Sequence, residues 1–587
     1  YEGTTLSYAP GAIVYNAMQL RPDIDGYNQY GPSGQVRWRV DEGSATQAGI
    51  VNGPVHIVKL GLGTLHLVGF ATNPASATID QGALNIDDFF GGSILVNAGA
   101  RLEGRGTMGS ARVRNGATLA PGTGLGMARV SVTGDLVFEA GSLLQLDVNA
   151  AGQSDSINVM GHALLNGQVQ VRAQSGDWQA ETRYTVLRAE QGLLGTRFAS
   201  AVTNLHFLQP TLSYDDKHAY LSLHRNATPL DDPAETPTED DVANTVDQDD
   251  PGVRDDILAM DKEQAREAFR QLSGSWHASV LSGLAEDSRH IRMATLQNAL
   301  PSTQHFWQQA FHATADRASY QGIPDDNRAL SGIAAGLTYP LGDRWHAGLL
   351  AGAQQSQARR SHAMASTRID SLHAGLSLAG RLSAADVAIG VVHSWHAVQS
   401  ARKIAVAGLR DALSGNTRGH TLQLFSEWTA PLRWLGATAR RLPATTQIAP
   451  FVRYAWVQTQ LRGHTESGGA AALKLEPARH TLHLATLGLK ADHTVETAQG
   501  QTRLHGELAW RHAGGDAKTH SRQRFRDSPQ QRAFTSEGQP IARQAWSLRL
   551  GFDAQAAKRM NLGFAYAGQY ARRQQEHGLH VNARWVF

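Results

Sequence analysis

Residues 546–554 have the sequence Trp-Ser-Leu-Arg-Leu-Gly-Phe-Asp-Ala, in which apolar and polar side chains alternate. Successive side chains of a β-strand point to opposite faces, so this pattern predicts a strand with one apolar and one polar face. The same alternation recurs in residues 303–587, for example at 504–511, 452–456 and 372–378. We expect about twelve such strands of roughly 9–15 residues, long enough to cross a bilayer when tilted by ~45°.

The end of the chain extends this pattern. Residues 577–587, His-Gly-Leu-His-Val-Asn-Ala-Arg-Trp-Val-Phe, alternate up to the last residue. A terminal strand leaves an exposed edge unless it pairs with another strand, and closure of the sheet into a barrel provides that pairing. Aromatic residues near strand ends, such as Trp428 and Tyr570, suit the interfaces of a membrane barrel. A large soluble β-sandwich is the alternative.

The composition limits the remaining possibilities. A chain of 587 residues implies several domains, and 59 glycines with 18% charged residues favour β-structure over helical bundles. The absence of cysteine excludes disulfides, thiolate zinc sites and cysteine catalysis, and a net charge of +2 gives no case for nucleic-acid binding. The sequence opens at Tyr1 with neither an initiator Met nor a basic-then-apolar leader, so we expect a processed product or a fragment. We favour the fragment, because the first forty residues show no closing motif of their own.

The first 225 residues contain a repeat. Glycine-alanine pairs at 82–83, 99–100 and 116–117 recur every 17 residues, and a related block, 141–144, follows 25 residues later. Within the repeat, Val96 and Leu102 correspond to Val113 and Leu119. Short strands separated by glycine at a near-constant period are typical of a β-solenoid, in which each coil covers the apolar face of the next. A β-sandwich with coincidental glycine-alanine pairs is the alternative.

An acidic segment with four prolines follows at 226–256. It has almost no aromatic residues and too few apolar side chains to order itself, so we predict a linker. Calcium binding is the alternative, but the central Gly and closing Glu of an EF-hand loop are missing.

Two helices are expected next, at 256–272 and at about 276–300, separated by Ser273 and Gly274. The second helix has apolar residues on one side and carries several charged residues. Such a helix cannot face lipid and needs water or charged walls. Its charged residues are Glu286, Asp287, Arg289, His290 and Arg292.

These features together resemble a type Va (monomeric) autotransporter of Gram-negative bacteria. The resemblance starts with the motif at 59–65, Lys-Leu-Gly-Leu-Gly-Thr-Leu. It continues through short motifs at the end of the solenoid and before the barrel, and it ends with the terminal strand. The short motifs lie at 119–122, 151–155, 184–187, 212–215, 272–274, 277–279 and 286–289. The resemblance implies an all-β chain in which a right-handed β-solenoid passenger fragment precedes a pore helix and a twelve-stranded transmembrane β-barrel.

The implied domains are a solenoid passenger remnant, an autochaperone-like end of the passenger, the acidic linker, a helical segment with a lumen helix, and the barrel. They span 1–133, 134–225, 226–256, 257–300 (lumen helix about 280–299) and 303–587. The charged helix then needs partners on inward strand faces, for which we name Arg503, Glu507, Arg549 and Arg584. The terminal strand matches the outer-membrane insertion signal, carried by Gly578, Val581, Ala583, Trp585 and Phe587.

The resemblance implies an outer-membrane protein that translocates its own passenger and anchors it on the cell surface. No Gly-x-Ser-x-Gly, subtilisin-type or His-Glu-x-x-His motif is present, and the 25 histidines suit wall positions better than metal sites. We therefore expect no catalytic residue, metal or cofactor in this chain. Two alternatives remain: the translocator and stalk of a subtilisin-like surface serine protease whose catalytic domain lies upstream of Tyr1, or an adhesin.

The expected partners follow from the same resemblance. They are outer-membrane lipid and lipopolysaccharide, the barrel-assembly machinery, periplasmic chaperones and a host surface bound in virulence, with no nucleic acid and a monomeric state.

Overall fold

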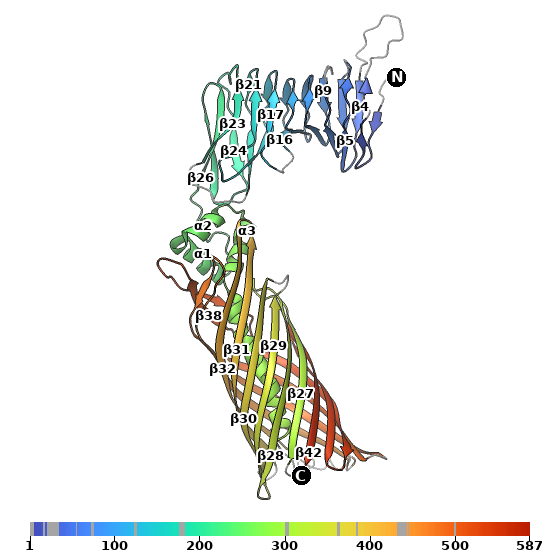
Figure 1. The fold of residues 1–587 in the computed structure, drawn as a ribbon, viewed down its shortest axis with the longest axis vertical. Helices are drawn as coiled ribbons and strands as arrows, with labels where there is room; N and C mark the ends of the chain where they lie inside the picture. Colours follow the sequence, from blue (N-terminus) through green and yellow to red (C-terminus); the bar gives the residue numbers. More distant parts are fainter. Residues whose placement is uncertain are drawn as a thin grey trace, which may run out of the picture. The chain divides into compact units, whose positions relative to one another are not determined.

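The computed structural model describes residues 5–15, 18–19, 35–53, 56–71, 76–122, 126–174, 182–299, 305–360, 364–382, 385–430, 443, 445–497 and 500–587. Tyr1 and the predicted domain ends at 300 and 303 lie outside these residues. The chain divides into two compact units, Tyr1–Pro233 with Arg254–Ala265, and Ala234–Val253 with Arg266–Phe587. Figure 1 shows the strands and helices of both units.

The first unit is a β-solenoid, as predicted, in which short strands stack into three long sheets (Figure 1). The first sheet contains β1 (Thr5–Ser7), β4 (Gln35–Arg39), β7 (His56–Leu60), β9 (Ser76–Ile79), β12 (Ser93–Val96), β15 (Ala111–Val113), β18 (Leu136–Phe138) and β21 (Ala163–Leu164). The second contains β2 (Ile13–Val14), β5 (Ser44–Gln47), β8 (Thr64–Leu67), β10 (Ala83–Ile86), β13 (Arg101–Gly104), β16 (Thr118–Pro121), β19 (Leu143–Val148), β22 (Gln168–Ala173) and β24 (Ser200–Thr203). The third contains β11 (Phe89–Phe90), β14 (Thr107–Met108), β17 (Arg129–Val132), β20 (Ser156–Val159), β23 (Thr182–Ala189), β26 (His218–Arg225) and β25 (Leu208–Tyr214). A separate two-stranded sheet is formed by β3 (Met18–Gln19) and β6 (Val51–Asn52).

The predicted repeat gives the register of these sheets. Val96 pairs with Val113, and Leu102 with Leu119, in parallel. Leu119 pairs in turn with Leu144, which confirms the longer step to the related block. These side chains are buried, so like residues stack along the solenoid in continuous apolar ladders.

The contacts of Lys59 explain why glycines recur in the motif at residues 59–65. Its buried ammonium donates to the carbonyl oxygens of Gly61 and Gly63, both at 2.8 Å, of Leu60 at 2.9 Å and of Gln81 at 3.2 Å. A Cβ at Gly61 would lie 2.2 Å from the Val40 oxygen, so the backbone can turn around the ammonium only without a side chain there. Burial lowers the pKa of Lys59 to about 8.

The parallel stacking ends at the C-terminal side of the solenoid. Strand β26 pairs antiparallel with both β23 and β25. These three strands form a local antiparallel ribbon on the last parallel coil.

Asp155 makes the stability of the solenoid depend on pH. Its side-chain oxygens accept hydrogen bonds from the backbone N–H groups of Ala128 at 2.7 Å and Asp147 at 2.8 Å. Burial raises its pKa to about 6. The folded solenoid therefore binds this proton more tightly than the unfolded chain does, so its stability falls as pH rises from about 4 to about 6.

Asp155→Asn should flatten this dependence, because Asn keeps one acceptor oxygen but does not titrate. The measurement is the urea midpoint for loss of intact passenger in pulse proteolysis between about pH 4 and about pH 7. Asp216→Asn, at an exposed carboxylate, is the control and should leave the pH dependence unchanged. An equal slope in wild type and the Asp155 variant would contradict the assignment.

The second unit contains a closed antiparallel barrel of twelve strands among the described residues, which confirms the predicted barrel. Its strands are β27 (His305–Arg317), β28 (Asp326–Leu341), β29 (Trp345–Arg360), β30 (Ala365–Leu382), β31 (Ala385–Val406), β32 (Leu409–Thr429), β33 (Thr446–Leu461), β36 (Ala478–Thr497), β37 (Gly500–Gly515), β40 (Gln544–Ala557), β41 (Met560–Ala571) and β42 (Gln574–Val586). The terminal strand closes the barrel: His305 of β27 pairs with Val586 of β42. The apolar faces point outward, and Leu372 is 63% exposed.

A second, smaller sheet lies in the loops at one end of the barrel, and alternation alone did not predict it. It contains β34 (His464–Thr465), β35 (Leu473–Leu475), β38 (His520–Phe525) and β39 (Phe534–Glu537). We call loops 462–477 and 516–543, which carry these strands, the cap, and this end of the barrel the cap end.

Four helices lie between the solenoid and the barrel in the described sequence: α1 (Pro237–Asp249), α2 (Pro251–Leu258), α3 (Lys262–Leu272) and α4 (Ser275–Gln297). The prediction that the acidic segment does not order itself is wrong, because α1 lies within it. Thr236 caps α1 by accepting from Glu239 N–H, and Val242, Ala243 and Val246 are buried on one side. In the described part of the chain, none of the helices combines the length and apolar character needed to span a membrane.

Candidate functional site

Helix α4 lies inside the barrel, where it is seen as a green coil behind the strands (Figure 1). Nearly all of its side chains are buried. It begins at Gly274, whose φ of 62° is left-handed and whose hypothetical Cβ would lie 2.5 Å from Leu473 of the cap. Glycine at this position therefore lets the helix start directly beneath the cap.

The helix bonds to strands around the whole circumference of the barrel. Near the cap end, Trp276 Nε1 donates to Thr367 Oγ1 of β30 at 2.7 Å, and Arg317 of β27 donates to Ser282 Oγ at 2.7 Å. Further along, Arg292 Nη1 donates to Gln423 Oε1 of β32 at 2.7 Å. The helix is thus held on several sides rather than packed against one wall.

Glu576 of the terminal strand β42 is the centre of this contact network. It is 0% exposed and binds Arg289 of the helix, and its Oε1 lies 2.9 Å from His290 Nε2. Arg328 of β28 lies 3.6 Å from the other oxygen and also pairs with Asp287 at 2.8 Å. One wall carboxylate therefore compensates cations from both the helix and the wall, as a buried charge requires.

A second ion pair connects Glu286 to the wall at β37. Arg511 of β37 lies 3.2 Å from Glu286, and Gln569 Nε2 of β41 donates to the same carboxylate at 3.2 Å. All five charged residues predicted for the lumen helix are thus placed inside the barrel. Glu286, Asp287 and Arg289 have ionic partners among the described wall residues, and His290 contacts Glu576. Arg292 bonds to neutral groups.

The four predicted wall residues differ in position. Arg584 donates to Asn298 Oδ1, just beyond α4, at 3.0 Å. Glu507 lies 3.3 Å from Arg453, and Arg549 lines a lumen cavity with α4 residues. Arg503 is not brought to the helix: its side chain is 52% exposed and pairs with Asp492 at 2.8 Å.

The predicted insertion-signal residues lie on the closing strand or directly after it. Val581, Ala583 and Trp585 alternate with inward residues such as His580, and Val581 and Phe587 are exposed on the outer face. Gly578 has the opposite parity and is buried, paired with Ala313. These five residues therefore combine outward apolar side chains with one inward glycine.

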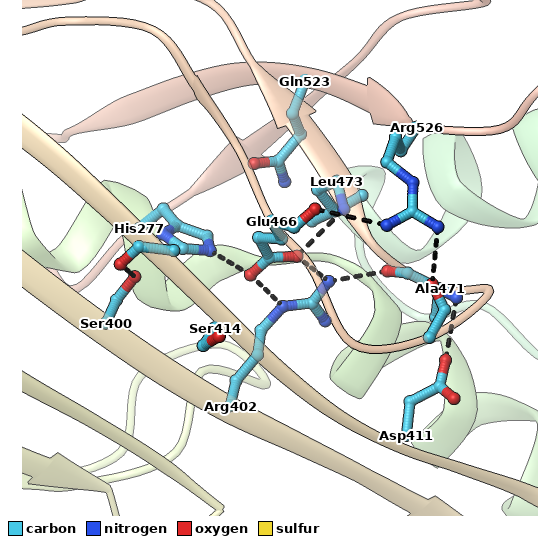
Figure 2. A network of polar contacts seen from close by, with 12 residues as sticks. His277, Ser400, Arg402, Asp411, Ser414, Glu466, Ala471, Leu473, Gln523 and Arg526 are labelled. Carbon is cyan, nitrogen blue, oxygen red and sulfur yellow. Dashed lines mark hydrogen bonds and ion pairs between the residues drawn. The ribbon is translucent and has the colours of Figure 1, made fainter.

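The cap is fixed to the top of the helix by a buried polar network (Figure 2). Glu466 of the cap receives two hydrogen bonds from Arg402 of β31, at 2.7 and 2.8 Å. Its carboxylate also lies 2.8 Å from His277 Nε2, in the first turn of α4, and accepts from Leu473 N–H at 2.9 Å. A single cap residue thus joins the barrel wall to the start of the helix.

Glu466→Gln should release loop 462–477. The variant leaves Arg402 buried beside a neutral group, and breaking a buried pair typically costs about 3–5 kcal/mol. We expect cleavage of this loop by protease added to intact cells, while the barrel stays folded. Glu476→Gln is the matched control on the same loop, because Glu476 is exposed and its distances to Arg522 and Arg524 are 3.7 and 3.5 Å. Equal resistance of both variants would contradict the role of Glu466.

Most of the barrel-wall residues that contact helix α4 were not predicted from the sequence. Arg328, Gln423, Arg511 and Glu576 all lie on polar faces of alternating strands, which is the signal that could have found them. Their pairing with particular helix residues depends on how the helix is rotated and how deep it sits. Within the described residues, no cluster of three or more His, Asp or Glu side chains is placed to hold a metal ion.

These features define the class of protein. A closed barrel with an apolar outside and a polar lumen occupied by the chain's own helix is suited to the outer membrane of Gram-negative bacteria.

Comparison with known proteins agrees with this class. Residues 306–567 match the family model described as autotransporter beta-domain. Two relatives described as extracellular serine proteases from Serratia marcescens are 24% and 23% identical and align with 99% of this chain. The chain spans about 60% of the length of these relatives.

Solved structures with similar folds include two translocator domains. The translocator domain of autotransporter NalP from Neisseria meningitidis is 12% identical with a TM-score of 0.42, and covers 53% of this chain and 99% of its own. The beta domain of the Bordetella autotransporter Brka is 18% identical with a TM-score of 0.36, and covers 49% of this chain and 100% of its own.

The match places the barrel region of this chain among autotransporter beta-domains. A closed barrel with this match indicates an outer-membrane protein.

Proposed function

We propose that the solenoid passes through the barrel lumen and that α4 then stays there as a plug. The observation that carries this proposal is the bonding of α4 around the whole barrel, with Glu576, Arg511, Gln423 and Thr367 on four different strands. The autochaperone-like end at 134–225 folds outside first and draws the rest of the passenger after it. The solenoid in this chain is a non-catalytic stalk.

Transit through the lumen can be tested with an engineered disulfide, which makes part of the passenger too wide to thread. Because the chain has no cysteine of its own, only the introduced pair can form this bond. Arg101 and Thr118 are direct partners in adjacent parallel strands, about 4.8 Å apart, so a disulfide between cysteines there fits the folded solenoid. We expect the oxidised Arg101→Cys/Thr118→Cys variant to stall with its passenger inside the cell, and reductant to restore export. Each single cysteine variant is a control and should be exported. Equal export of the oxidised double variant would contradict threading of an unfolded chain.

The plug can be tested by reversing charges on its surface. Arg289→Glu and Arg292→Glu place new carboxylates beside Glu576 and within a buried wall, so both variants should loosen α4 and raise uptake of large polar antibiotics. Arg503→Glu, at a half-exposed residue that does not contact the helix, should leave uptake unchanged. Unchanged uptake in both helix variants at normal outer-membrane levels would show that α4 is not held by lumen charge.

We also infer the partners that assembly requires. The barrel-assembly machinery and periplasmic chaperones act on the terminal strand before closure, and the outward apolar band contacts lipid and lipopolysaccharide in a monomeric unit.

A second candidate function concerns a longer precursor. Both Serratia relatives are described as extracellular serine proteases and extend well beyond the length that this chain matches. This supports a serine protease domain on the same polypeptide, with the solenoid as its stalk. The coding sequence before Tyr1 tests this proposal, because it should encode a serine protease domain. A serine-directed reagent should then inhibit the proteolytic activity of the secreted protein. More glycine-rich coils there, and host-cell binding by the purified passenger, would favour an adhesin instead.

A further inference from the structure

A basic cavity lies beside α4 in the lumen. It has a volume of about 70 Å³ and is lined by five arginines but only one carboxylate: Arg289, Arg292, Arg453, Arg511, Arg549 and Glu507. A single water needs roughly 10–15 Å³ of such space, so the cavity has room for several waters or one small ion.

Three of the arginines have carboxylate partners. Arg289 binds Glu576, and Arg511 binds Glu286. Arg453 lies between two acids, Glu427 at 2.5 Å and Glu507 at 3.3 Å. The nearby acids are therefore already engaged.

Arg292 has no acidic partner in the described part of the structure. It is 4% exposed, and its Nη1 donates to two neutral acceptors, Gln423 Oε1 at 2.7 Å and Ser288 Oγ at 3.5 Å. No described residue accepts from its other guanidinium nitrogens, and Arg292 is one of the residues that line the cavity. The guanidinium cannot lose its proton, and an unpaired buried charge costs several kcal/mol.

Arg549 approaches the same cavity from β40. It is the direct cross-strand neighbour of Glu507, yet no ion pair or hydrogen bond of its guanidinium occurs among the described residues. Glu507 bonds to Arg453 instead, through both of its oxygens at 3.3 Å. Two arginines from the helix and the wall thus line one cavity without an acid of their own.

We propose that this cavity is a binding site for a small inorganic anion, held by Arg292 of the helix and Arg549 of the wall. A guanidinium presents its N–H donors in a planar fork that suits an oxyanion such as sulfate or phosphate, and chloride is the smaller candidate. The anion compensates the surplus charge and joins α4 to β40. Seating of the helix then depends on the anion.

The experiment uses the full chain folded in detergent. Its thermal unfolding, followed by gel mobility, is measured against sulfate, phosphate or chloride, with ionic strength held constant by a bulky organic anion. A ligand that binds only the folded state raises the unfolding temperature in a saturable way. We expect saturable stabilisation in wild type and, for Arg292→Gln and Arg549→Gln, an apparent affinity at least about tenfold weaker, as loss of one charge-assisted bond gives.

Arg503→Gln is the matched control, since this exposed wall arginine already has Asp492 and should leave the affinity unchanged. Should Arg292→Gln fail to fold, Arg549→Gln tests the same site from the wall. A bromide-soaked crystal should give an anomalous peak between Arg292 and Arg549. The proposal is overturned if wild type shows no saturable effect, if both variants keep wild-type affinity, or if the cavity contains water alone.

Discussion

Replacing Glu576 with Gln should lower the stability of the plugged barrel more than any other single change of charge. The variant leaves Arg289, His290 and Arg328 around a neutral side chain, and only Arg328 keeps another carboxylate, Asp287. Removal of one partner from a buried ion pair typically costs about 3–5 kcal/mol. We expect a lower temperature for the loss of compact gel mobility and less protein in the outer membrane.

Two further variants separate charge from packing. Glu496→Gln removes an exposed carboxylate on β36 and should leave the unfolding temperature unchanged. Adding Arg289→Gln to Glu576→Gln should restore part of the lost stability, because removing both partners of a buried pair is often nearly neutral. An unfolding temperature like that of wild type in Glu576→Gln alone would mean that this cluster does not hold the helix.

Deleting Phe587 should strongly reduce the amount of barrel in the outer membrane. Phe587 is exposed at the end of the closing strand, beside the face that carries Trp585 and Val581. Burying one such ring against a receptor or in lipid contributes about 1.5–3 kcal/mol. Its loss therefore corresponds to a decrease of about tenfold or more in a binding equilibrium during assembly. The measurement is immunodetection in washed outer membranes.

Phe587→Tyr is the control, because it keeps an aromatic ring at the last position and should assemble normally. The purified deletion variant should still fold in detergent, since Phe587 lies beyond β42 and the strand pairing with β27 remains. Outer-membrane levels equal to wild type after the deletion would contradict the insertion-signal hypothesis.

The two β architectures could be predicted because each repeats a short-range rule. Alternation at 546–554 gave a strand with an outward apolar face, and the spacing from Leu102 to Leu119 gave the register between coils. Such patterns depend only on the period of side chains along a strand and on the stacking of identical units. They do not depend on how distant segments meet.

The acidic segment shows where composition alone misleads. The many acids between 226 and 256 predicted an unordered linker, but Val242 and Val246 share one helix face and are buried. Glu239 is buried against Arg270 at 2.7 Å, and Asp249 accepts from Arg532 N–H of the cap at 2.8 Å. Long-range partners offset the charge, and no local pattern reveals them.

Only the polar character of the lumen site could be predicted from the sequence, and not its particular residue pairs. The polarity of residues 286–292 required a wet or charged environment, and inward arginines were expected around it. Arg503 was named and lies at a half-exposed position, while Glu576 and Arg328 were not. Which wall residue meets which helix residue depends on the rotation of α4, a tertiary property that alternation along strands does not encode.

The antiparallel β23–β26–β25 ribbon has a consequence for the direction in which the solenoid can lengthen. Parallel coils leave an open edge at both ends of a stack, but in the third sheet the reversed strand β26 interrupts the parallel series before the edge strand β25. In this sheet the parallel series of coils thus ends at β23, and its regular register continues only toward β11. A second passenger that approaches this end of the third sheet therefore meets β25 and not the face of a parallel coil.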